Sequence, residues 1–255
     1  MSRIHEAFEN KKAFIAFLTA GDPDFETSVR NFKAVAEAGA DLIEVGIPFS
    51  DPIAEGPVIQ EADIRALSAG MTTDRVFELV KEVRKEVKIP MVFMTYANPV
   101  FHYGKESFFE KAAEAGIDGI IIPDVPYEES GEFRAAAEEK GVDLISMIAP
   151  TSEARIKDIA KDAKGFIYVV SSLGVTGVRT EITTDLSGII AAIREVTDVP
   201  AAIGFGISRP DQAKKMAGYA DGVIVGSAMV RIVAEKGKDA PKALYEYVKS
   251  MKEVL

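Results

Sequence analysis

The chain has 255 residues, 47% of them hydrophobic and 27% charged, with two histidines and no cysteine. This length can bury a full core, and the residue counts exclude disulfides, thiolate nucleophiles, thiolate metal sites and three-histidine zinc centres. The formal net charge of −10 excludes an ordinary nucleic-acid-binding protein, because nucleic acids select basic surfaces.

The first residues predict a short amphipathic helix over 2–10, in which Ile4 and Phe8 share one face. This segment lacks the apolar core of a signal peptide, and no apolar stretch approaches the roughly 20 residues that span a bilayer. We therefore expect a cytoplasmic protein with no membrane contact and no bound metal. A second helix is expected over 25–38, where apolar residues recur at helical spacing until Gly39 ends it.

One sequence pattern then recurs along the chain: a helix, a glycine, an aspartate and a short apolar run. Glycine supplies a left-handed helix cap, and the run is too uniformly apolar for a half-exposed strand. The pattern occurs at 39–45, 116–122, 141–147 and 218–225. Two more apolar runs begin at Pro90 and Pro200. The runs 14–18 and 166–170 complete eight candidate strands.

Strands that alternate with helices indicate parallel pairing through right-handed crossovers. Eight such units in about 250 residues match a (β/α)8 barrel, the TIM-barrel fold. An open doubly wound sheet is the alternative, and the absence of a GxGxxG fingerprint after the first strand disfavours it. We predict one α/β domain over 1–255, a TIM barrel preceded by a short extra helix.

Carboxylates gather where the second strand ends. Glu44 interrupts the apolar run 42–45, and Asp51 and Glu55 lie in the proline-rich loop that follows. A carboxylate inside a strand loses its hydration, so it needs a partner, a raised pKa or a chemical role. Catalytic groups of (β/α)8 barrels lie at the carboxyl ends of the strands, so this segment is typical of an active site.

Glycines mark the ends of the seventh and eighth strands. Gly206 follows one run, and Gly226 and Ser227 open a predicted helix after the other. Barrel enzymes often hold phosphate between these two loops, where backbone N–H groups and a helix N-terminus favour an anion. The pair of loops therefore predicts a phosphate site.

The residues together resemble one family, the alpha subunit of tryptophan synthase, and the resemblance runs through the whole chain in order. The matching motifs are Leu-Thr-Ala-Gly-Asp-Pro (18–23), Glu-Val-Gly-Ile-Pro-Phe-Ser-Asp-Pro (44–52), Met-Thr-Tyr-Ala-Asn-Pro (94–99), Asp-Val-Pro (124–126), Gly-Val-Thr-Gly (174–177), Gly-Phe-Gly-Ile-Ser (204–208) and Gly-Ser-Ala (226–228).

The resemblance implies a cofactor-independent retro-aldol cleavage of indole-3-glycerol phosphate to indole and glyceraldehyde 3-phosphate. It makes Glu44 the main acid/base, and burial in the barrel mouth would raise the pKa of Glu44 toward neutrality. The second carboxylate of the family, which handles the indole N–H, is usually an aspartate, and here Glu55 stands in its place. Asp51 competes for that role, although an aspartate before proline more often fixes a turn.

The same matching assigns the rest of the site. For each apolar or aromatic residue of the pocket described next, packing in the ordinary core of the barrel is the alternative role. Tyr168 has a further alternative, a hydrogen bond near Glu44. The resemblance implies phosphate binding by Gly177, Gly206, Gly226 and Ser227, an indole pocket of Phe17, Tyr168, Phe205 and Ile224, and a closing lid that involves Asp51 and Thr176.

The resemblance further implies an α2β2 complex that passes indole to a beta subunit carrying pyridoxal phosphate. The loop 46–57 and the segment around Pro126 would contact that partner. Two other functions stay open: a sugar-phosphate isomerase of tryptophan or histidine biosynthesis, and a mainly regulatory or channelling subunit with weak activity alone. The Glu55 departure favours the second of these.

Overall fold

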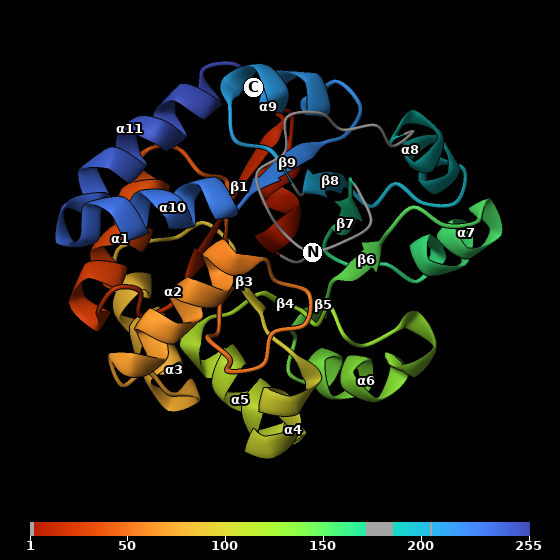
Figure 1. The fold of residues 1–255 in the computed structure, drawn as a ribbon. Helices are drawn as coiled ribbons and strands as arrows, with labels where there is room; N and C mark the ends of the chain where they lie inside the picture. The colour runs from red at the N-terminus through yellow and green to blue at the C-terminus, as the bar shows by residue number, and fades with distance from the viewer. Residues whose placement is uncertain (1–2, 172–185, 205) are drawn as a thin grey trace.

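The computed structural model describes residues 3–171, 186–204 and 206–255. Parallel strands form a ring that is surrounded by helices (Figure 1). The strands are β1 (Ala13–Thr19), β2 (Leu42–Gly46), β3 (Met91–Met94), β4 (Gly119–Ile121), β5 (Asp143–Leu144), β6 (Ser146–Ile148), β7 (Ile167–Val170), β8 (Ala201–Gly204) and β9 (Gly222–Val225). The helices are α1 (Phe25–Glu37), α2 (Pro57–Ser68), α3 (Thr73–Arg84), α4 (Ala97–Tyr103), α5 (Lys105–Ala115), α6 (Gly131–Glu139), α7 (Glu153–Lys161), α8 (Leu186–Arg194), α9 (Pro210–Ala217), α10 (Ser227–Lys236) and α11 (Ala240–Lys252), with 3₁₀ turns η1 (Arg3–Phe8), η2 (Tyr127–Glu129) and η3 (Gly237–Asp239).

The sheet order is β5-β4-β3-β2-β1-β9-β8-β7-β6, and every pairing is parallel. Only Ile145 separates β5 from β6, and its N–H donates to the carbonyl of Ile120 at 2.8 Å. The two pieces are therefore one expected strand with a local break, and they join the two ends of the sheet. The predicted (β/α)8 barrel is confirmed.

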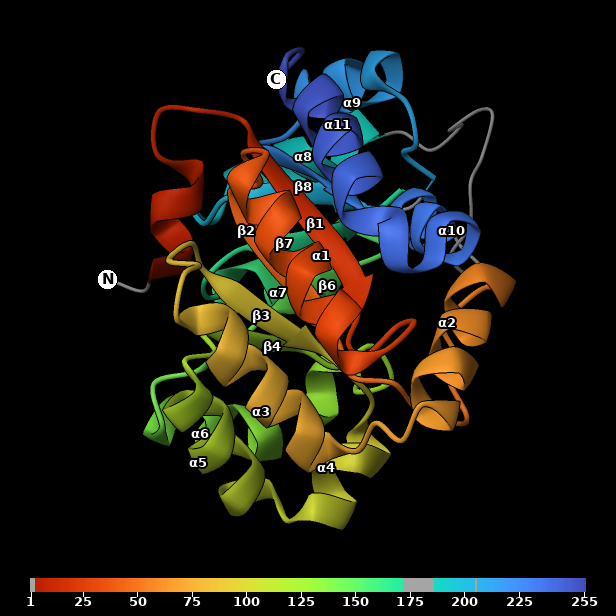
Figure 2. The same cartoon turned by 90° about the vertical axis from the view of Figure 1, so that its left-hand side faces the viewer.

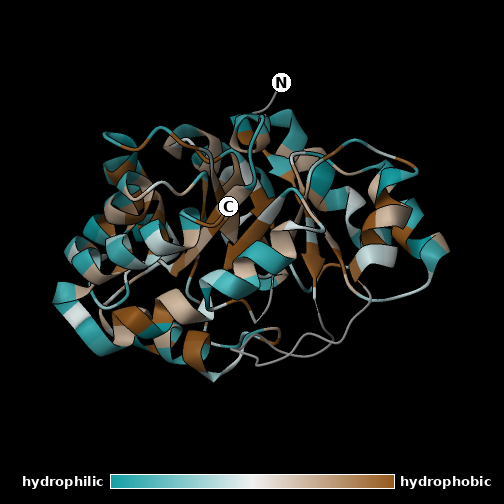
Figure 3. Ribbon diagram, turned by 90° about the horizontal axis from the view of Figure 1, so that it is seen from above, coloured by the Kyte–Doolittle hydropathy of each residue, from teal (hydrophilic) through white to brown (hydrophobic). Residues whose placement is uncertain are grey.

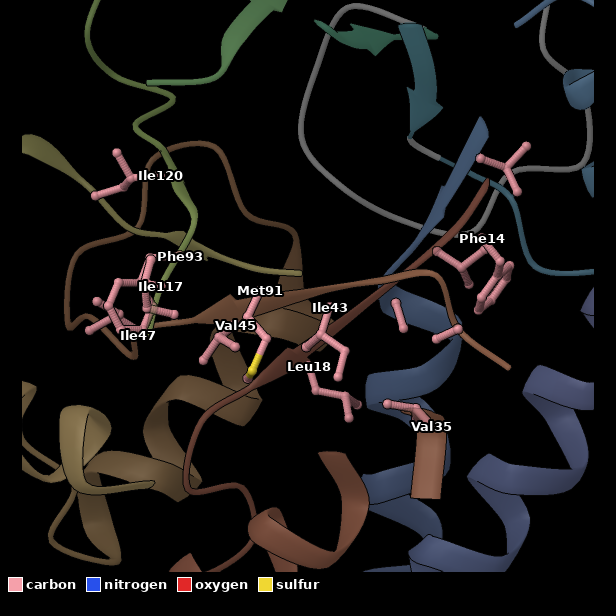
Figure 4. Packing of buried hydrophobic residues seen from close by; sticks show 14 of the residues in the cluster. Phe14, Leu18, Val35, Ile43, Val45, Ile47, Met91, Phe93, Ile117 and Ile120 are labelled. Carbon is pink, nitrogen blue, oxygen red and sulfur yellow. The ribbon is translucent and has the colours of Figure 1, made fainter. Parts of the chain in front are cut away.

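Alternation along the strands divides the core into two parts. Figure 3 shows apolar strands inside and more hydrophilic helices outside. One cluster, which includes Phe14, Ile43 and Phe93, packs between the sheet and the helices (Figure 4). The other, which includes Ile15 and Leu42, fills the barrel interior. Glu44 shares the interior face with Leu42, because side chains two apart on a strand point the same way.

The N-terminal segment closes one end of the barrel. It forms the 3₁₀ turn η1 rather than an α-helix. In Figure 1 this turn lies near the middle of the ring, and in Figure 2 it lies on the side of the barrel opposite to α2. A Cβ added to Gly119 would lie 3.0 Å from the Ile4 side chain, and the rings of Phe8 and Phe166 are 5.8 Å apart. The expected shared face of Ile4 and Phe8 therefore covers the barrel floor. Ser2, the first residue of the expected helix, lies outside the described residues.

The structure shows what the aspartates of the repeated sequence pattern do. At three of the four repeats the carboxylate lies at the start of its strand and accepts a backbone N–H from a neighbouring strand. The N–H of Phe14 donates to Asp41 at 2.8 Å, that of Met91 to Asp118 at 2.9 Å and that of Ala201 to Asp221 at 2.8 Å. These bonds link neighbouring strands at their amino ends, where the backbone ladder has not yet begun. This end of the barrel is the one remote from the catalytic loops.

Asp118→Ala should lower the free energy of unfolding by about 3–5 kcal/mol, because it leaves a buried cation without its partner. Asp118 also binds Arg3 and Arg84 at 2.7 and 2.8 Å, and the Arg84 side chain is only 12% exposed. Burial already lowers the pKa of Arg84 to about 10. Urea unfolding measures the loss. The exposed Glu110→Ala is the control, and an equal change in both variants would contradict the assignment.

No helix in the described ranges is long and apolar enough to cross a membrane.

Candidate active site

Glu44 is the most unusual side chain of the barrel interior. It is 1% exposed, and within the described chain neither of its carboxylate oxygens has a hydrogen-bond partner. Its neighbours across the ladder are Phe17 on β1 and Val92 on β3, and no described ion pair involves it. Burial, and then the nearby charge of Glu55, raise the pKa of Glu44 to about 8. At neutral pH Glu44 is therefore mainly a protonated acid in an apolar wall, able to donate a proton.

Glu55 lies near Glu44 at the barrel mouth. It is 4% exposed, and three contacts organise its segment of the loop between β2 and α2. The Tyr96 hydroxyl donates to Glu55 Oε1 at 3.4 Å and accepts the Ala54 N–H at 3.1 Å, while Gln60 Nε2 donates to the Glu55 carbonyl at 2.7 Å.

Asp51 is placed differently from Glu55, although both belong to the same loop. It is exposed, and its carboxylate accepts a hydrogen bond from the Ser50 hydroxyl at 2.5 Å. Asp51 thus lies at the surface beside the Ser50 hydroxyl, while Glu55 is the loop carboxylate that interacts electrostatically with Glu44.

Aromatic rings line the mouth because glycines leave room for them. A Cβ on Gly46 would lie 2.7 Å from the Phe17 ring, and one on Gly226 would lie 3.2 Å from it. A Cβ on Gly204 would lie 2.4 Å from the Tyr168 hydroxyl oxygen. With Ile224, these two rings form an apolar wall beside Glu44. The alternative hydrogen bond from Tyr168 to Glu44 is not formed, since the described contacts leave both Glu44 oxygens unbonded.

Gly204→Ala should therefore displace the Tyr168 ring and lower kcat/KM for the proposed substrate at least tenfold. Overpacking of this kind also costs about 1–3 kcal/mol of stability. Steady-state kinetics and thermal unfolding measure the two effects. Gly131→Ala is the matched control, because a Cβ there meets no atom within 4 Å. Normal kinetics for Gly204→Ala would show that the ring position does not matter.

The predicted phosphate residues are only partly described. Ser227 begins α10 with Gly226 as its N-cap, as expected, and a Cβ added to Gly226 would lie 3.2 Å from Phe17, so the start of this helix lies beside the mouth. Gly206 has φ of 81°, a backbone conformation that other residues rarely adopt. Gly177, Thr176 and Phe205 lie outside the described residues.

One charged residue of the site was missed in the sequence. Asp63 on α2 is 6% exposed, and burial followed by the charge of Glu55 raises its pKa to about 8. The signal was its spacing: Asp63 falls on the same helix face as Ile59, Ala62 and Ala66, all buried.

A cavity of about 410 Å³ opens beside the mouth, between α6 and α7. It reaches the interior side chains of Ile145, Met147 and Val170, but neither Glu44 nor Glu55 lines it. We therefore place the chemistry at the carboxylates rather than in this cavity. In the part of the chain that the structure describes, no group of three or more His, Asp or Glu side chains could hold a metal ion.

Comparisons with known proteins agree with this geometry. The sequence model of the family "Tryptophan synthase alpha chain" matches residues 4–255. The tryptophan synthase alpha chain of Lactiplantibacillus plantarum is 53% identical over 256 residues, covering 100% of this chain and 97% of that protein. A structure of Mycobacterium tuberculosis tryptophan synthase has a TM-score of 0.90 at 34% identity, covering 99% and 98% of the two chains. A structure of the Pyrococcus furiosus tryptophan synthase a2b2 complex has a TM-score of 0.83 at 36% identity, covering 94% and 97%.

With a barrel of this topology, a buried acid at the end of its second strand and a family match over nearly all its length, the chain belongs to the tryptophan synthase alpha chain family, the cofactor-independent lyases that cleave indole-3-glycerol phosphate.

Proposed function

We propose that this chain, as a single-domain alpha subunit, cleaves indole-3-glycerol phosphate at the mouth of its barrel with Glu44 as acid and base. The observation that carries the assignment is the buried Glu44 carboxyl, which has no hydrogen-bond partner in the described chain and a pKa raised to about 8. Such a group can give up a proton and take one back near neutral pH.

The proton moves in a closed cycle. Glu44 gives its proton to C3 of the indole ring, which leaves a positive charge on the ring nitrogen. The resulting carboxylate removes the proton from the side-chain hydroxyl next to the breaking bond. The electrons of that O–H bond form the aldehyde of glyceraldehyde 3-phosphate, and the C–C electrons return to the ring to give indole. Glu44 is then protonated again, so no net proton is consumed.

Glu55 stabilises the intermediate from the other side of the ring. Its carboxylate accepts the indole N–H and balances the positive charge that develops there, as preorganised charges do in enzyme sites. Phe17, Tyr168 and Ile224 form the apolar wall, and Phe205 completes it. The substrate phosphate binds at the N-terminus of α10, through Gly226 and Ser227, together with Gly206 and Gly177. Thr176 closes over the site and contacts Asp51 or Glu55.

A beta subunit is the expected partner, because the Pyrococcus furiosus relative is described as an a2b2 complex. The loop 46–57 and the segment around Pro126 would form the contact. Ile53, a large apolar side chain in that loop, is 73% exposed, which suits a docking surface. Pyridoxal phosphate would belong to the partner, and the complex would act in the cytoplasm.

Indole release from indole-3-glycerol phosphate by the purified chain, alone and with a beta subunit, tests the proposal. We expect indole and glyceraldehyde 3-phosphate in equal amounts, with faster turnover in the complex. Absence of cleavage under both conditions would favour the sugar-phosphate isomerase. Cleavage that is unaffected by the partner would contradict the proposed complex.

A further inference from the structure

Asp124 lies in the loop directly after β4, and the proposed cleavage gives it no role. It is half-buried, and both of its carboxylate oxygens accept the Ala97 N–H, at 3.0 and 3.2 Å. Ala97 is the first residue of α4, and the N-cap residue of that helix, Tyr96, makes no side-chain cap hydrogen bond within the described ranges. Asp124 therefore supplies, from a neighbouring strand, the acceptor that α4 lacks at its own start.

The backbone on both sides of Tyr96 is bonded to β4 and to the loop after it. On one side the Thr95 N–H donates to the Ile121 carbonyl at 3.1 Å, which continues the pairing of β3 with β4. On the other side the Ala97 N–H donates to Asp124. Because the first bond joins two backbone groups, only the second can be removed by substituting a side chain. Asp124 is thus the side chain that fixes the backbone at Tyr96.

The side chain of Tyr96 joins this fixed backbone to the catalytic loop. It is 4% exposed, and its hydroxyl accepts the Ala54 N–H at 3.1 Å and donates to Glu55 Oε1 at 3.4 Å. The ring lies 5.6 Å from the ring of Phe49, in the same loop. Burial, and then the charge of Glu55, raise the pKa of Tyr96, so the hydroxyl keeps its proton and remains a donor.

We propose that Asp124 is a positioning residue of this enzyme: it holds the backbone at Ala97, so that the Tyr96 hydroxyl keeps the Glu55 carboxylate at the barrel mouth. This inference rests on the proposed function of Glu55 in the cleavage. Asp124 does not touch the substrate and acts only through Tyr96. Since the charge that Glu55 balances develops during the reaction, a misplaced Glu55 should lower kcat more than it raises KM.

Two substitutions of Asp124 test whether the bond to Ala97 matters. Asp124→Ala removes the acceptor of the Ala97 N–H, whereas Asp124→Asn keeps a carbonyl oxygen there. We expect Asp124→Ala to lower kcat about tenfold with a smaller change in KM, because small displacements of reacting groups are costly. Asp124→Asn should recover most of that loss. Assays of the purified chain without a beta subunit exclude an effect on the expected contact around Pro126.

Asp24→Ala is the matched control. Asp24 is also half-buried, and it caps α1 by accepting the Thr27 N–H at 2.8 Å. Its removal therefore deletes a comparable carboxylate bond at the start of another helix, with no link to Tyr96 in the described contacts. We expect kcat of Asp24→Ala to stay close to the parental value. A loss equal to that of Asp124→Ala would overturn the specific role of Asp124.

A double-mutant cycle separates action through Tyr96 from a general loosening of the barrel. Tyr96→Phe alone should lower kcat about tenfold, since the ring stays while the hydroxyl bonds to Ala54 and Glu55 are lost. In that background Asp124→Ala should have almost no further effect, because the hydroxyl that it positions is absent. Should Asp124→Ala not fold, Asp124→Glu takes its place in the cycle, because it keeps the charge and shifts the acceptor by one methylene.

Three kinetic results would overturn the proposal. The first is an equal fall in kcat when Asp124 is substituted in the parent and in Tyr96→Phe. The second is parental kcat in Asp124→Ala or in Tyr96→Phe. The third is an Asp124→Asn variant as impaired as Asp124→Ala.

Hydrogen exchange of two amides gives a readout that needs no substrate. Protection of the Ala54 amide should fall about tenfold in both Asp124→Ala and Tyr96→Phe, since each weakens its bond to the hydroxyl. Protection of the Ala97 amide should fall only in Asp124→Ala. If the parent chain cleaves nothing, the proposed function fails while these amides still decide whether Asp124 holds the loop. Unchanged protection of Ala54 in Asp124→Ala would overturn that role.

Discussion

Glu44→Gln is expected to lower kcat for indole release by about 10²–10⁴-fold, the usual contribution of a general acid and base. Glutamine fills the same space beside Phe17 and Val92 but has no proton of suitable acidity to donate to the ring. The measurement is indole formation in single-turnover and steady-state assays, alone and with the beta subunit. Circular dichroism and thermal unfolding control for folding. A variant with parental kcat would contradict the assignment of Glu44.

The same substitution has a pH signature in stability. The pKa of Glu44 is raised from its ordinary value of 4.5 to about 8 in the folded chain. Between these values the folded state keeps the proton and the unfolded state loses it, so parental stability falls as pH rises through this window. As pH rises from 4.5 to about 8, Glu44→Gln should therefore gain a few kcal/mol of stability relative to the parent, since one pKa unit corresponds to about 1.4 kcal/mol. Urea unfolding at several pH values measures the difference, and a pH-independent difference would contradict it.

Glu55→Gln is expected to lower kcat by about 10²–10³-fold, as the loss of one preorganised electrostatic contact does elsewhere. The amide can still receive the bond from Tyr96 but cannot balance the charge on the indole nitrogen. Glu61→Gln removes an exposed carboxylate from α2, so comparing its kcat with that of Glu55→Gln separates this effect from a general loss of negative charge. Retained kcat in Glu55→Gln would leave the N–H contact without a catalytic role.

Glu55→Asp is the companion variant, because the family usually has aspartate at this position. The Tyr96 hydroxyl reaches Glu55 Oε1 at 3.4 Å, so shortening the side chain by one methylene withdraws the oxygen from an already long bond. We expect about a tenfold fall in kcat, since small displacements of reacting groups are costly. A rise in kcat would mean that glutamate itself limits this enzyme.

The fold was largely predictable because the strands are short apolar runs set off by glycine and aspartate. The sequence also indicated Glu44, since a lone acid in an apolar strand has few structural explanations. The break at Ile145 was not predictable, because apolar periodicity does not show where a strand leaves its ladder. Asp63 was overlooked because an isolated acid in a helix normally faces solvent.

The site was less predictable from the sequence than the fold. Glu55 is buried and Asp51 is not, because the loop packs against Tyr96. The contact between Tyr96 and Glu55 joins residues that are 41 apart in the chain. No local pattern carries information of that kind. The roles of Thr176, Gly177 and Phe205 remain predictions, as does the single-domain organisation.

The junction at Ile145 lets a single strand close the ring by changing its partner along its length. Its first part, β5, pairs with β4, and its second part, β6, pairs with β7. The Ile145 N–H donates to the Ile120 carbonyl at 2.8 Å, so the bonding toward β4 continues up to the break. Glu44 lies on the opposite wall, where β2 pairs with β1 along one edge and with β3 along the other. The backbone that carries the proton donor is therefore held on both edges by neighbours of its own ladder, away from the point where the ring is joined.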